Sequence, residues 1–468
     1  MTPLPTSWSE TQLGSLIERI EAGLNVKCEE RPPQGAERGL VKISAVTWGR
    51  FNEEQSKTLP ADISVSSDVQ IHSGDLLFSR ANTIELVGAT VLVEKIEKCL
   101  YLSDKVLRLV VPEESKRWIN YAMKTAVVRT AIQNASSGNQ LSMRNVSQEK
   151  LRQIPIPVAP LPEQKRIADK LDSVLARVDA CRDRLDRLPT LLKRFRRSIL
   201  AAATSGRLTQ EWREENSNCS LCNKKPVGWT ICRIKDAGKV QLGRQRSPKF
   251  HVGNSMRPYL RVQNVFEDRL DLSDVMTMDF PGKDFERYQL HPGDILLNEG
   301  QSPEYLGRPA MYRGELPGAC FTNTLIRFQA YPHVTADYAL MVFRNHMHSG
   351  RYISEGTITT NIAHLGAGRF SEVEFPLPPL AEQHEIVRRV ESLFTFADRL
   401  EARLATARKQ VEQLTPALLA KAFRGELVPQ DPADEPAAEL LKRLAATRAA
   451  APPIKRGRKT APKTKSMG

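Results

Sequence analysis

Apolar residues recur in alternating steps of three and four along two long segments of this chain. The first segment follows residue 160, the second follows residue 379, and charged residues fill most of the positions between the apolar ones. This spacing places one apolar stripe along a helix and is typical of a coiled-coil seam. Pro189 and Pro416 lie inside these segments, and each removes a backbone hydrogen bond, so we expect a kink in both helices. The predicted seam residues are Ile167, Leu171, Val174, Val178, Leu185, Leu192, Phe195 and Ile199 in the first helix, and Ile386, Val390, Leu393, Leu400, Leu404, Val411, Leu414 and Leu418 in the second.

Short apolar runs rich in β-branched residues precede each long helix. Runs at residues 40–46 and 106–111, and again at 259–265 and 325–328, predict short strands, and helices are expected near 118–133 and 336–351. Both halves of the chain are therefore expected to be mixed α/β.

Proline-rich segments at residues 154–157 and 375–378 lead from each half into its long helix. Proline fixes φ and disfavours helix in the residue before it. We expect these segments to be stiff extended spacers at domain boundaries.

The two halves repeat one another. Residues 72–77 (HSGDLL) return 219 positions later as 291–296 (HPGDIL), and residues 160–164 (PLPEQ) return as 379–383 (PLAEQ). A period this long indicates a duplicated domain pair and excludes a solenoid of short repeats. Two similar halves in one chain act like a fused homodimer and suit a two-part target and two copies of one partner. His72 and His291 precede a Gly-Asp pair in both copies, which favours a structural turn.

The connection between the long helices predicts their relative direction. Because the termini of a compact domain often lie close together, the second half should return the chain beside the end of the first helix. We therefore predict α/β (mixed) domains in tandem duplication, separated by an antiparallel two-helix coiled coil of roughly 60 Å. The expected segments are residues 1–158 (first domain), 159–208 (first helix), 209–226 (linker), 227–377 (second domain), 378–428 (second helix) and 429–468 (linker, short helix and basic tail).

Composition narrows the choice of partner. The chain has 468 residues, 41% of them apolar, which is enough for sizeable cores, and a formal net charge of +14. This charge favours a polyanion, although a solvated basic surface is the alternative. No apolar run reaches 18 residues, so we expect no membrane span. Seven scattered cysteines and the lack of a signal-peptide pattern predict a cytoplasmic protein.

Motifs for catalysis or metal binding are missing. The sequence has no G-x-x-x-x-G-K-[ST] loop, no H-E-x-x-H and no Asn-Pro-Pro-aromatic segment. The isolated glycines at 366 and 368 are expected to lead into a proline segment rather than a helix. Cys219 and Cys222 have zinc-knuckle spacing but no second pair nearby, which favours an inert linker. We expect neither a cofactor nor a metal in this chain.

Polar loop residues in both halves are candidates for reading DNA bases. Arginine suits guanine, and asparagine and glutamine suit adenine, although each residue taken alone is also compatible with a solvated surface. The basic run at 193–197 is interpreted as the wet face of the coil, and the tail at 452–468 as a disordered segment that attracts phosphate or has no specific role. The candidates are Lys42, Arg80, Asn82, Asn139, Gln140 and Arg144 in the first half, and Arg244, Arg246, Arg261, Gln263, Asn264, Gln301, Asn323, Thr359 and Asn361 in the second.

The helix motifs resemble one known family. Residues 160–167 (PLPEQKRI) and 192–209 resemble the start and end of the first conserved helix in specificity (S) subunits of type I restriction–modification systems. Residues 378–383 and 420–428 resemble the second conserved helix. The resemblance covers residues 5–450, with the globular halves matching only in plan. Residues 361–370 depart from it, since glycines stand where the family has a polar segment leading into a strand.

The resemblance implies a division of labour. Two target-recognition domains, held apart by the helices, would each read one half of a bipartite, asymmetric site in double-stranded DNA. The helices would dock two modification (M) subunits, which bind S-adenosylmethionine and methylate adenine. Restriction (R) subunits, which use ATP and Mg²⁺, would complete the complex, and this chain would not itself be an enzyme.

Two alternatives stay open at this point. A self-sufficient DNA methyltransferase or nuclease would need a cofactor or metal motif, and would methylate DNA without a partner. A coiled-coil scaffold that binds only protein would lack the steep salt dependence that phosphate contacts produce.

Overall fold

The computed structural model describes residues 4–140, 143–216, 228–359 and 362–450. The chain forms two compact units, Met1–Arg184 with Ala407–Gly468 (unit 1) and Leu185–Thr406 (unit 2). Each unit contains one globular half and a stretch of both long helices, α5 (Leu161–Thr204) and α12 (Leu380–Ala422).

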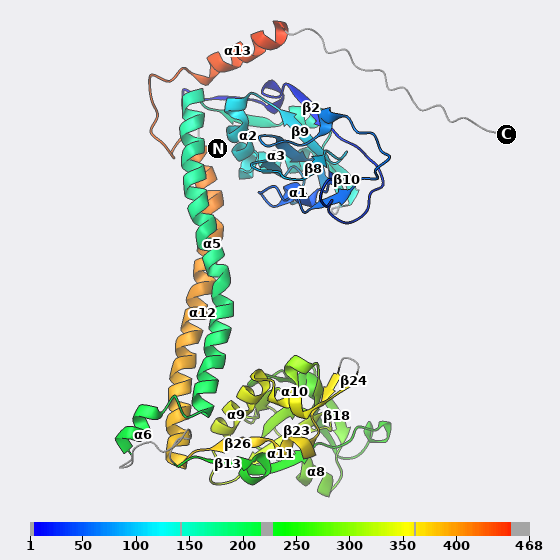
Figure 1. Ribbon diagram of the computed structural model, residues 1–468, viewed down its shortest axis with the longest axis vertical. Coiled ribbons are helices and arrows are strands. Elements are labelled where there is room, and N and C mark those ends of the chain that lie inside the picture. Colours follow the sequence, from blue (N-terminus) through cyan, green and yellow to red (C-terminus); the bar gives the residue numbers. More distant parts are fainter. Residues whose placement is uncertain (1–3, 141–142, 217–227, 360–361, 451–468) are drawn as a thin grey trace, which may run out of the picture. The chain divides into compact units, whose positions relative to one another are not determined.

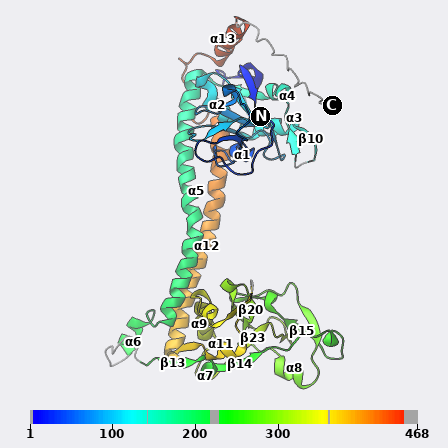
Figure 2. The same ribbon diagram turned by 45° about the vertical axis from the view of Figure 1, so that its right-hand side comes forward.

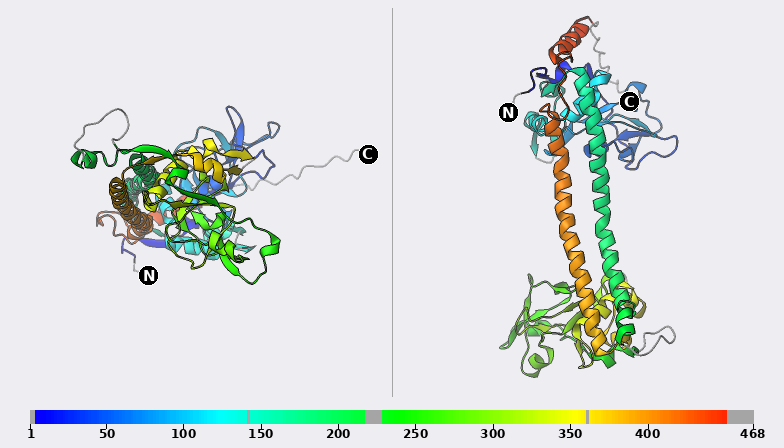
Figure 3. Two further views of the ribbon diagram at one scale, coloured as in Figure 1. Left: turned by 90° about the horizontal axis from the view of Figure 1, so that it is seen from below. Right: turned by 90° about the vertical axis from the view of Figure 1, so that its left-hand side faces the viewer.

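The long helices pair in opposite directions within each unit. In unit 1, Ile167 and Leu171 near the start of α5 share a core with Leu419 and Ala422 near the end of α12. In unit 2, the end of α5 shares a core with Ile386, near the start of α12. The two helices lie side by side in this way in Figure 3. The predicted antiparallel pairing is therefore confirmed, and both helices continue through their prolines. That the globular halves stand at opposite ends of the pair stays a prediction.

Burial along the seam is uneven. Most predicted seam residues are buried or half-buried, and those near the helix ends, such as Ile167 and Ile386, are fully buried. Phe195 and Leu414 are exceptions, because 37% and 43% of their surfaces are exposed. A pair of helices covers only a narrow strip, and these two side chains lie outside it. Their assignment to the buried seam is corrected.

Each globular half is built on a four-stranded antiparallel sheet with helices on one face. Strand order is β2-β9-β5-β7 in the first half and β14-β23-β19-β21 in the second, so the predicted duplication is confirmed. Figures 1 and 2 draw both halves as mixed strands and helices. The first sheet comprises β2 (Arg19–Ala22), β5 (Leu76–Ser79), β7 (Thr90–Leu92) and β9 (Val106–Val110), covered by α2 (Lys116–Ala122) and α3 (Ala126–Ala135). The second comprises β14 (Gly238–Leu242), β19 (Ile295–Asn298), β21 (Pro309–Met311) and β23 (Leu325–Ala330), covered by α9 (Ala336–His348).

Alternating side chains of these strands serve two cores. Ile295 and Leu297 face the helix α9, whereas Leu296 between them joins a second core with Phe321. Successive side chains of a strand point to opposite faces, so a strand buried on both faces is apolar throughout. This explains the continuous apolar runs of the sequence.

Two smaller sheets recur in each half. They carry the loops in which most of the candidate DNA-reading residues lie. The first half has the sheets β4-β3-β8 (Ser56–Thr58, Arg38–Val41 and Cys99–Tyr101) and β10-β11-β6 (Ser137–Gln140, Met143–Asn145 and Ala81–Asn82). The second half has β18-β15-β22 (Met276–Asp279, Met256–Leu260 and Cys320–Phe321) and β20-β25-β24 (Gly300–Gln301, Ile362–His364 and Thr357–Thr359).

The proline-rich segments are strands, not spacers. β12 (Pro155–Val158) pairs with β1 (Ser9–Gln12), and β26 (Glu374–Leu377) pairs with β13 (Thr230–Arg233). Each pair is a separate two-stranded sheet, in which a proline that cannot donate a hydrogen bond is tolerated. The extended conformation was predicted correctly, but the spacer role was wrong.

Gly-Asp turns open the central strand of each half. The Asp75 carboxylate accepts a hydrogen bond from the backbone of His72 at 2.8 Å, and Asp294 accepts one from His291 at 3.0 Å. Gly74 and Gly293 have φ of 87° and 95°, a region that favours glycine. The predicted structural turn is confirmed.

Buried glutamates at the start of each long helix fix the helix to its globular half. Glu163 accepts a hydrogen bond from the Trp8 indole at 2.9 Å and Glu382 accepts one from Trp229 at 2.8 Å. Both glutamates are 1% exposed. Acidic groups suit a helix N-terminus because its free N–H groups are partly positive.

The segment after Gly366, the linker and the C-terminal region remain to be compared with the predictions. The glycines at 366 and 368 lead into a short helix, α11 (Ala367–Glu372), contrary to our prediction, because Phe370 anchors this turn in the core. The linker contains the helix α6 (Gln210–Asn216), and the predicted C-terminal helix is α13 (Ala437–Ala450). Cys219, Cys222 and the basic tail lie outside the described residues. No helix among the described residues is long and apolar enough to span a membrane.

Candidate nucleic-acid interface

A three-stranded sheet gathers four of the predicted readers of the first half. Asn82 on β6 is the register partner of Arg144 on β11, and Asn139 and Gln140 belong to the paired strand β10. In the second half, Gln301 on β20 and Thr359 on β24 occupy the equivalent sheet. Asn361 lies outside the described residues. Segments that are far apart in the sequence therefore meet in each half.

Two of these side chains have structural partners. The Arg144 guanidinium donates to the hydroxyl and carbonyl oxygens of Ser136 and to the carbonyl of Gly138, and so fixes its own hairpin. The Asn82 amide donates to Thr47 at 3.2 Å, and its oxygen accepts from the backbone of Thr83. Both are held in place before any ligand binds.

A cavity of about 560 Å³ lies in the first half beside this sheet. Lys42 and Asn82 line it, as do Lys57 and Lys105, which were not among the predicted residues. Lys42 and Lys57 share the carboxylate of Glu30. Lys105 is exposed and has no ion pair in the part of the chain that the structure describes. Arg80, whose backbone bonds to that of Lys105, is half-buried. Clustered lysines suit the phosphates of a nucleic acid.

Two predicted readers of the second half are buried. Arg244 is 7% exposed, forms an ion pair with Asp284 at 2.9 Å and stacks over Phe250 at 3.8 Å. Asn264 is 2% exposed and donates to two backbone carbonyls across a loop. These side chains hold the fold and cannot present their polar groups to a base, so both assignments are corrected.

The remaining predicted DNA-reading residues of the second half differ in exposure and in the contacts that they make within the domain. Arg261 forms an ion pair with Asp274 at 2.5 Å. The Gln301 oxygen accepts a hydrogen bond from the backbone of Ser302. Gln263 is exposed, and Asn323 is half-buried beside Arg244, to which its backbone donates.

An exposed cationic patch surrounds β15. We use "cationic patch" for Arg246, Lys249 and Arg257, each of which lies over an aromatic ring at 5.8, 4.8 and 4.3 Å respectively. All three are exposed and have no ion pair within the described residues. Only Arg246 was predicted. The rings beneath Arg246 and Arg257 belong to Tyr259 and Phe285, which are distant in the sequence, so no local pattern marked these two cations.

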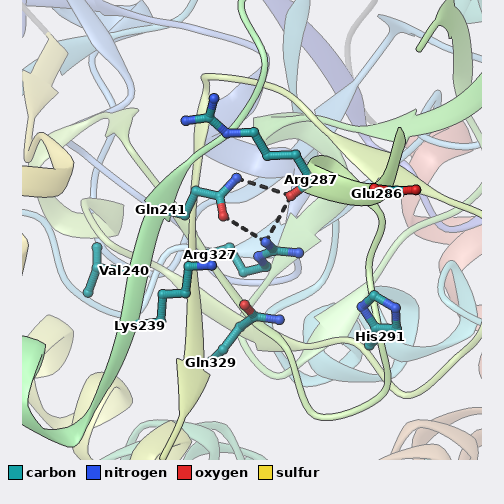
Figure 4. A pocket seen from close by; sticks show the side chains of 8 residues that line it. All are labelled: Lys239, Val240, Gln241, Glu286, Arg287, His291, Arg327 and Gln329. Atoms are coloured by element: carbon teal, nitrogen blue, oxygen red, sulfur yellow. Dashed lines mark hydrogen bonds between the residues drawn. The ribbon is translucent and has the colours of Figure 1, made fainter. Parts of the chain in front are cut away.

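Arg327 is one of the residues that line a hollow of about 370 Å³ in the second half (Figure 4). The Arg327 guanidinium donates to the Gln241 side chain and to the backbone carbonyl of Arg287, as Figure 4 shows, and pairs with Asp294 at 3.3 Å. The first half repeats the pair as Arg108 and Asp75 at 2.9 Å. Burial lowers the pKa of Arg327. The duplicated pair is structural, and this hollow is not assigned a ligand.

Among the described residues, no cluster of three or more His, Cys, Asp or Glu could hold a metal ion. The arrangement in each half is instead one of cationic and amide side chains around short strands. Such groups bind phosphates and base edges by hydrogen bonds and charge.

A family model matches the chain twice. Residues 7–189 and 226–408 both match the type I restriction modification DNA specificity domain, and the two matches begin 219 residues apart, as the sequence repeat does. The chain belongs to the family of type I restriction–modification specificity subunits.

Relatives and solved structures agree with this membership. The chain is 32% identical over 98% of its length to the type I restriction enzyme StySPI specificity subunit of Salmonella potsdam, covering 97% of that protein. It is 31% identical over 73% of its length to the EcoKI specificity subunit of Escherichia coli (strain K12), covering 74% of that protein. The fold resembles the crystal structure of the HsdS subunit from Thermoanaerobacter tengcongensis, with a TM-score of 0.55 at 19% identity over 90% of this chain and 98% of that one.

Membership in the specificity family decides between the functions left open by the sequence. Specificity subunits supply DNA recognition to type I systems, and the alternatives of a self-sufficient methyltransferase or nuclease and of a pure scaffold are not favoured. The tandem mixed α/β domains and long paired helices are those of this family.

Proposed function

We propose that this chain is the DNA-recognition subunit of a type I restriction–modification complex in which each globular half reads one part of a bipartite, asymmetric site. The observation that carries the proposal is the duplicated specificity domain, matched at residues 7–189 and 226–408. Each copy presents strands and loops with amide and cationic side chains. The copies differ at most of these positions, so two different half-sites are expected.

The partner of each half is double-stranded DNA. Lys105 in the first half and the cationic patch in the second supply charges that have no acidic partner among the described residues. Such charges neutralise phosphates and release counterions, which gives affinity a steep dependence on salt.

The long helices dock the modification subunits in this proposal. Leu188, Leu191 and Phe195 lie at steps of three and four on α5, and 38%, 50% and 37% of their surfaces are exposed. An exposed apolar stripe on a helix suits a protein partner. Leu414, at the repeat position of Phe195, is also exposed on α12. Two similar helices support two copies of the modification subunit.

The chemistry of the complex then belongs to the other subunits. This chain would hold no cofactor, while the modification subunits would bind S-adenosylmethionine and the restriction subunits would use ATP and Mg²⁺. The DNA target of a restriction system places the complex in the cytoplasm.

Methylome sequencing tests the proposal. The modification subunit is expressed with and without this chain in a host that lacks other adenine methylation. We expect N6-methyladenine at one bipartite motif only when the chain is present. Methylation that persists without the chain would contradict the proposal, as would incorporation of label from S-adenosylmethionine by the purified chain alone.

A domain graft assigns the two half-sites. Residues 8–157 are replaced by the corresponding segment of a relative with another motif. One half of the methylated motif should change and the other should stay the same, because each globular half has its own core. A change in both halves would refute independent reading.

A further inference from the structure

Trp48 is exposed to solvent and lines the cavity in the first half. Its surface is 73% exposed, whereas Trp8, Trp118 and Trp229 are buried. No hydrogen bond to its indole is found among the described residues. A single exposed apolar residue needs no explanation by itself. The fixed turn and the cavity beside Trp48 indicate that this exposed indole binds a ligand.

The turn that carries Trp48 is fixed. Trp48 ends the short helix α1 (Ser44–Thr47), and Gly49 after it has φ of 80°. Arg50 forms an ion pair with Asp179 of α5 at 2.6 Å, and both residues lie in unit 1. The Thr47 hydroxyl donates to the backbone of Ile43 and accepts from Asn82. The backbone that carries Trp48 therefore loses little freedom when a ligand covers the indole.

The cavity beside Trp48 carries a small excess of positive charge. Lys42, Lys57 and Lys105 line it together with the Asn82 amide and the carboxylates of Glu30 and Asp104. Glu30 pairs with the first two lysines, and Lys105 forms no ion pair among the described residues. A protein partner would be expected to offer acidic side chains here, whereas DNA offers phosphates at regular spacing next to base edges. The indole provides one apolar face and one N–H donor.

The second half shows what the same turn needs for its own stability. The backbone hydrogen bond from Asn52 to Ala45 returns as that from Asp271 to Asn264, which fixes the alignment of the two turns. Glu267 stands at the position of Trp48, and it accepts hydrogen bonds from Arg344 at 2.9 Å and His348 at 2.8 Å on α9. In the second half, the side chain at this position therefore ties the turn to the helix α9 of its own domain. The exposed indole is therefore not required by the turn.

We propose that Trp48 contacts the major-groove edge of a thymine in the half-site read by the first globular half. Among the major-groove edges, only thymine offers a methyl group beside a carbonyl acceptor, and these match the ring and the N–H of an indole. The lysines of the cavity hold the neighbouring phosphates. This inference rests on the proposed function and adds a specificity-determining residue that acts in one half only.

Binding of uracil-substituted DNA tests the contact. The complex with the modification subunit is titrated by fluorescence anisotropy with a duplex carrying its methylated motif, and with duplexes in which deoxyuridine replaces thymine in one half-site. Loss of the methyl group from the first half-site should weaken binding by the wild-type complex about fourfold. Trp48→Ala should weaken binding to the thymine duplex on the order of tenfold or more and should no longer distinguish thymine from uracil.

Matched controls separate this contact from general binding. Uracil in the second half-site should have the same effect on the wild type and on Trp48→Ala. Val127→Ala removes another exposed apolar side chain, on α3 and outside the cavity, and should change nothing. Lys105→Ala should weaken binding to the thymine and uracil duplexes equally.

Three results would overturn the inference. One is a half-site, assigned to residues 8–157 by the graft, without thymine on either strand. Another is an equal response of the wild type and Trp48→Ala to uracil in that half-site. The third is loss of the modification subunit from Trp48→Ala on co-purification, which would make Trp48 a protein contact. If the wild-type chain directs no bipartite methylation at all, the proposed function itself fails.

Discussion

Glu163 and Glu382 occupy equivalent places at the starts of the two long helices, yet their carboxylates have different hydrogen-bond donors. Glu382 receives hydrogen bonds from Trp229, from the Thr209 hydroxyl at 2.6 Å and from the Arg213 guanidinium. Glu163 receives them from Trp8 and the Gln430 amide, and neither donor is charged. One repeated carboxylate thus belongs to a buried ion pair, whereas the other is held by neutral donors.

The segments that follow the long helices cause this difference. In unit 2 the residues after α5 bring Thr209 and Arg213 to Glu382, while in unit 1 the residues after α12 bring Gln430 to Glu163. Arg166 is near Glu163 but forms its ion pair with Asp434 at 2.5 Å. The duplicated part of the sequence supplies the carboxylate, and the parts that diverged supply its partner.

The largest expected difference between the units comes from matched substitutions of these glutamates. Glu382→Gln leaves Arg213 charged, largely buried and unpaired, which should lower the free energy of unfolding of unit 2 by about 3–5 kcal/mol. Glu163→Gln keeps neutral partners and should cost unit 1 about 1 kcal/mol or less. Hydrogen exchange at the starts of α5 and α12 measures both effects in the full chain. Equal losses of protection would show that Arg213 does not distinguish the two sites.

A pH titration should show a smaller difference. Burial raises the pKa of Glu163, and the hydrogen bonds from Trp8 and Gln430 oppose this only in part. Because the folded state favours the protonated acid, this stabilisation of unit 1 is complete below the ordinary glutamate value near 4.5 and is lost as the pH rises through the higher folded-state pKa. The free energy of unfolding of Glu163→Gln, compared with wild type between pH 4 and 7, should lack that contribution. A constant difference across this range would contradict the assignment.

The smallest expected effect concerns DNA and compares the two cationic surfaces. Lys105→Ala in the first half and Arg257→Ala in the cationic patch should each weaken binding to all sequences alike. Each should also reduce the slope of log affinity against log salt by about 1. Arg313→Ala, which removes an arginine paired with Asp268, serves as the control and should leave the slope unchanged. A change in the methylated motif for either variant would instead indicate base reading.

Prediction of the site failed for burial at two positions, and the DNA contacts of the other candidates stay predictions. The residue types at Arg244 and Asn264 suit base recognition, yet Phe250 and Asp284 enclose the first and a loop encloses the second. Lys57, Lys105 and Arg257 were missed because isolated cations carry no local pattern. Their grouping depends on strands that are distant in sequence.

The sequence alone determined the repeat, the two helices, their antiparallel pairing and the membership in the specificity family. Periodicity and a fixed spacing of 219 residues are properties of the chain, and helices need only local hydrogen bonds and a continuous apolar stripe. Only the tertiary structure decided that the proline segments pair as strands, that Phe195 lies outside the buried seam, and which carboxylate gains a cation. These outcomes depend on contacts between residues far apart in sequence, where burial and charge pairing are set by neighbours that no local pattern names.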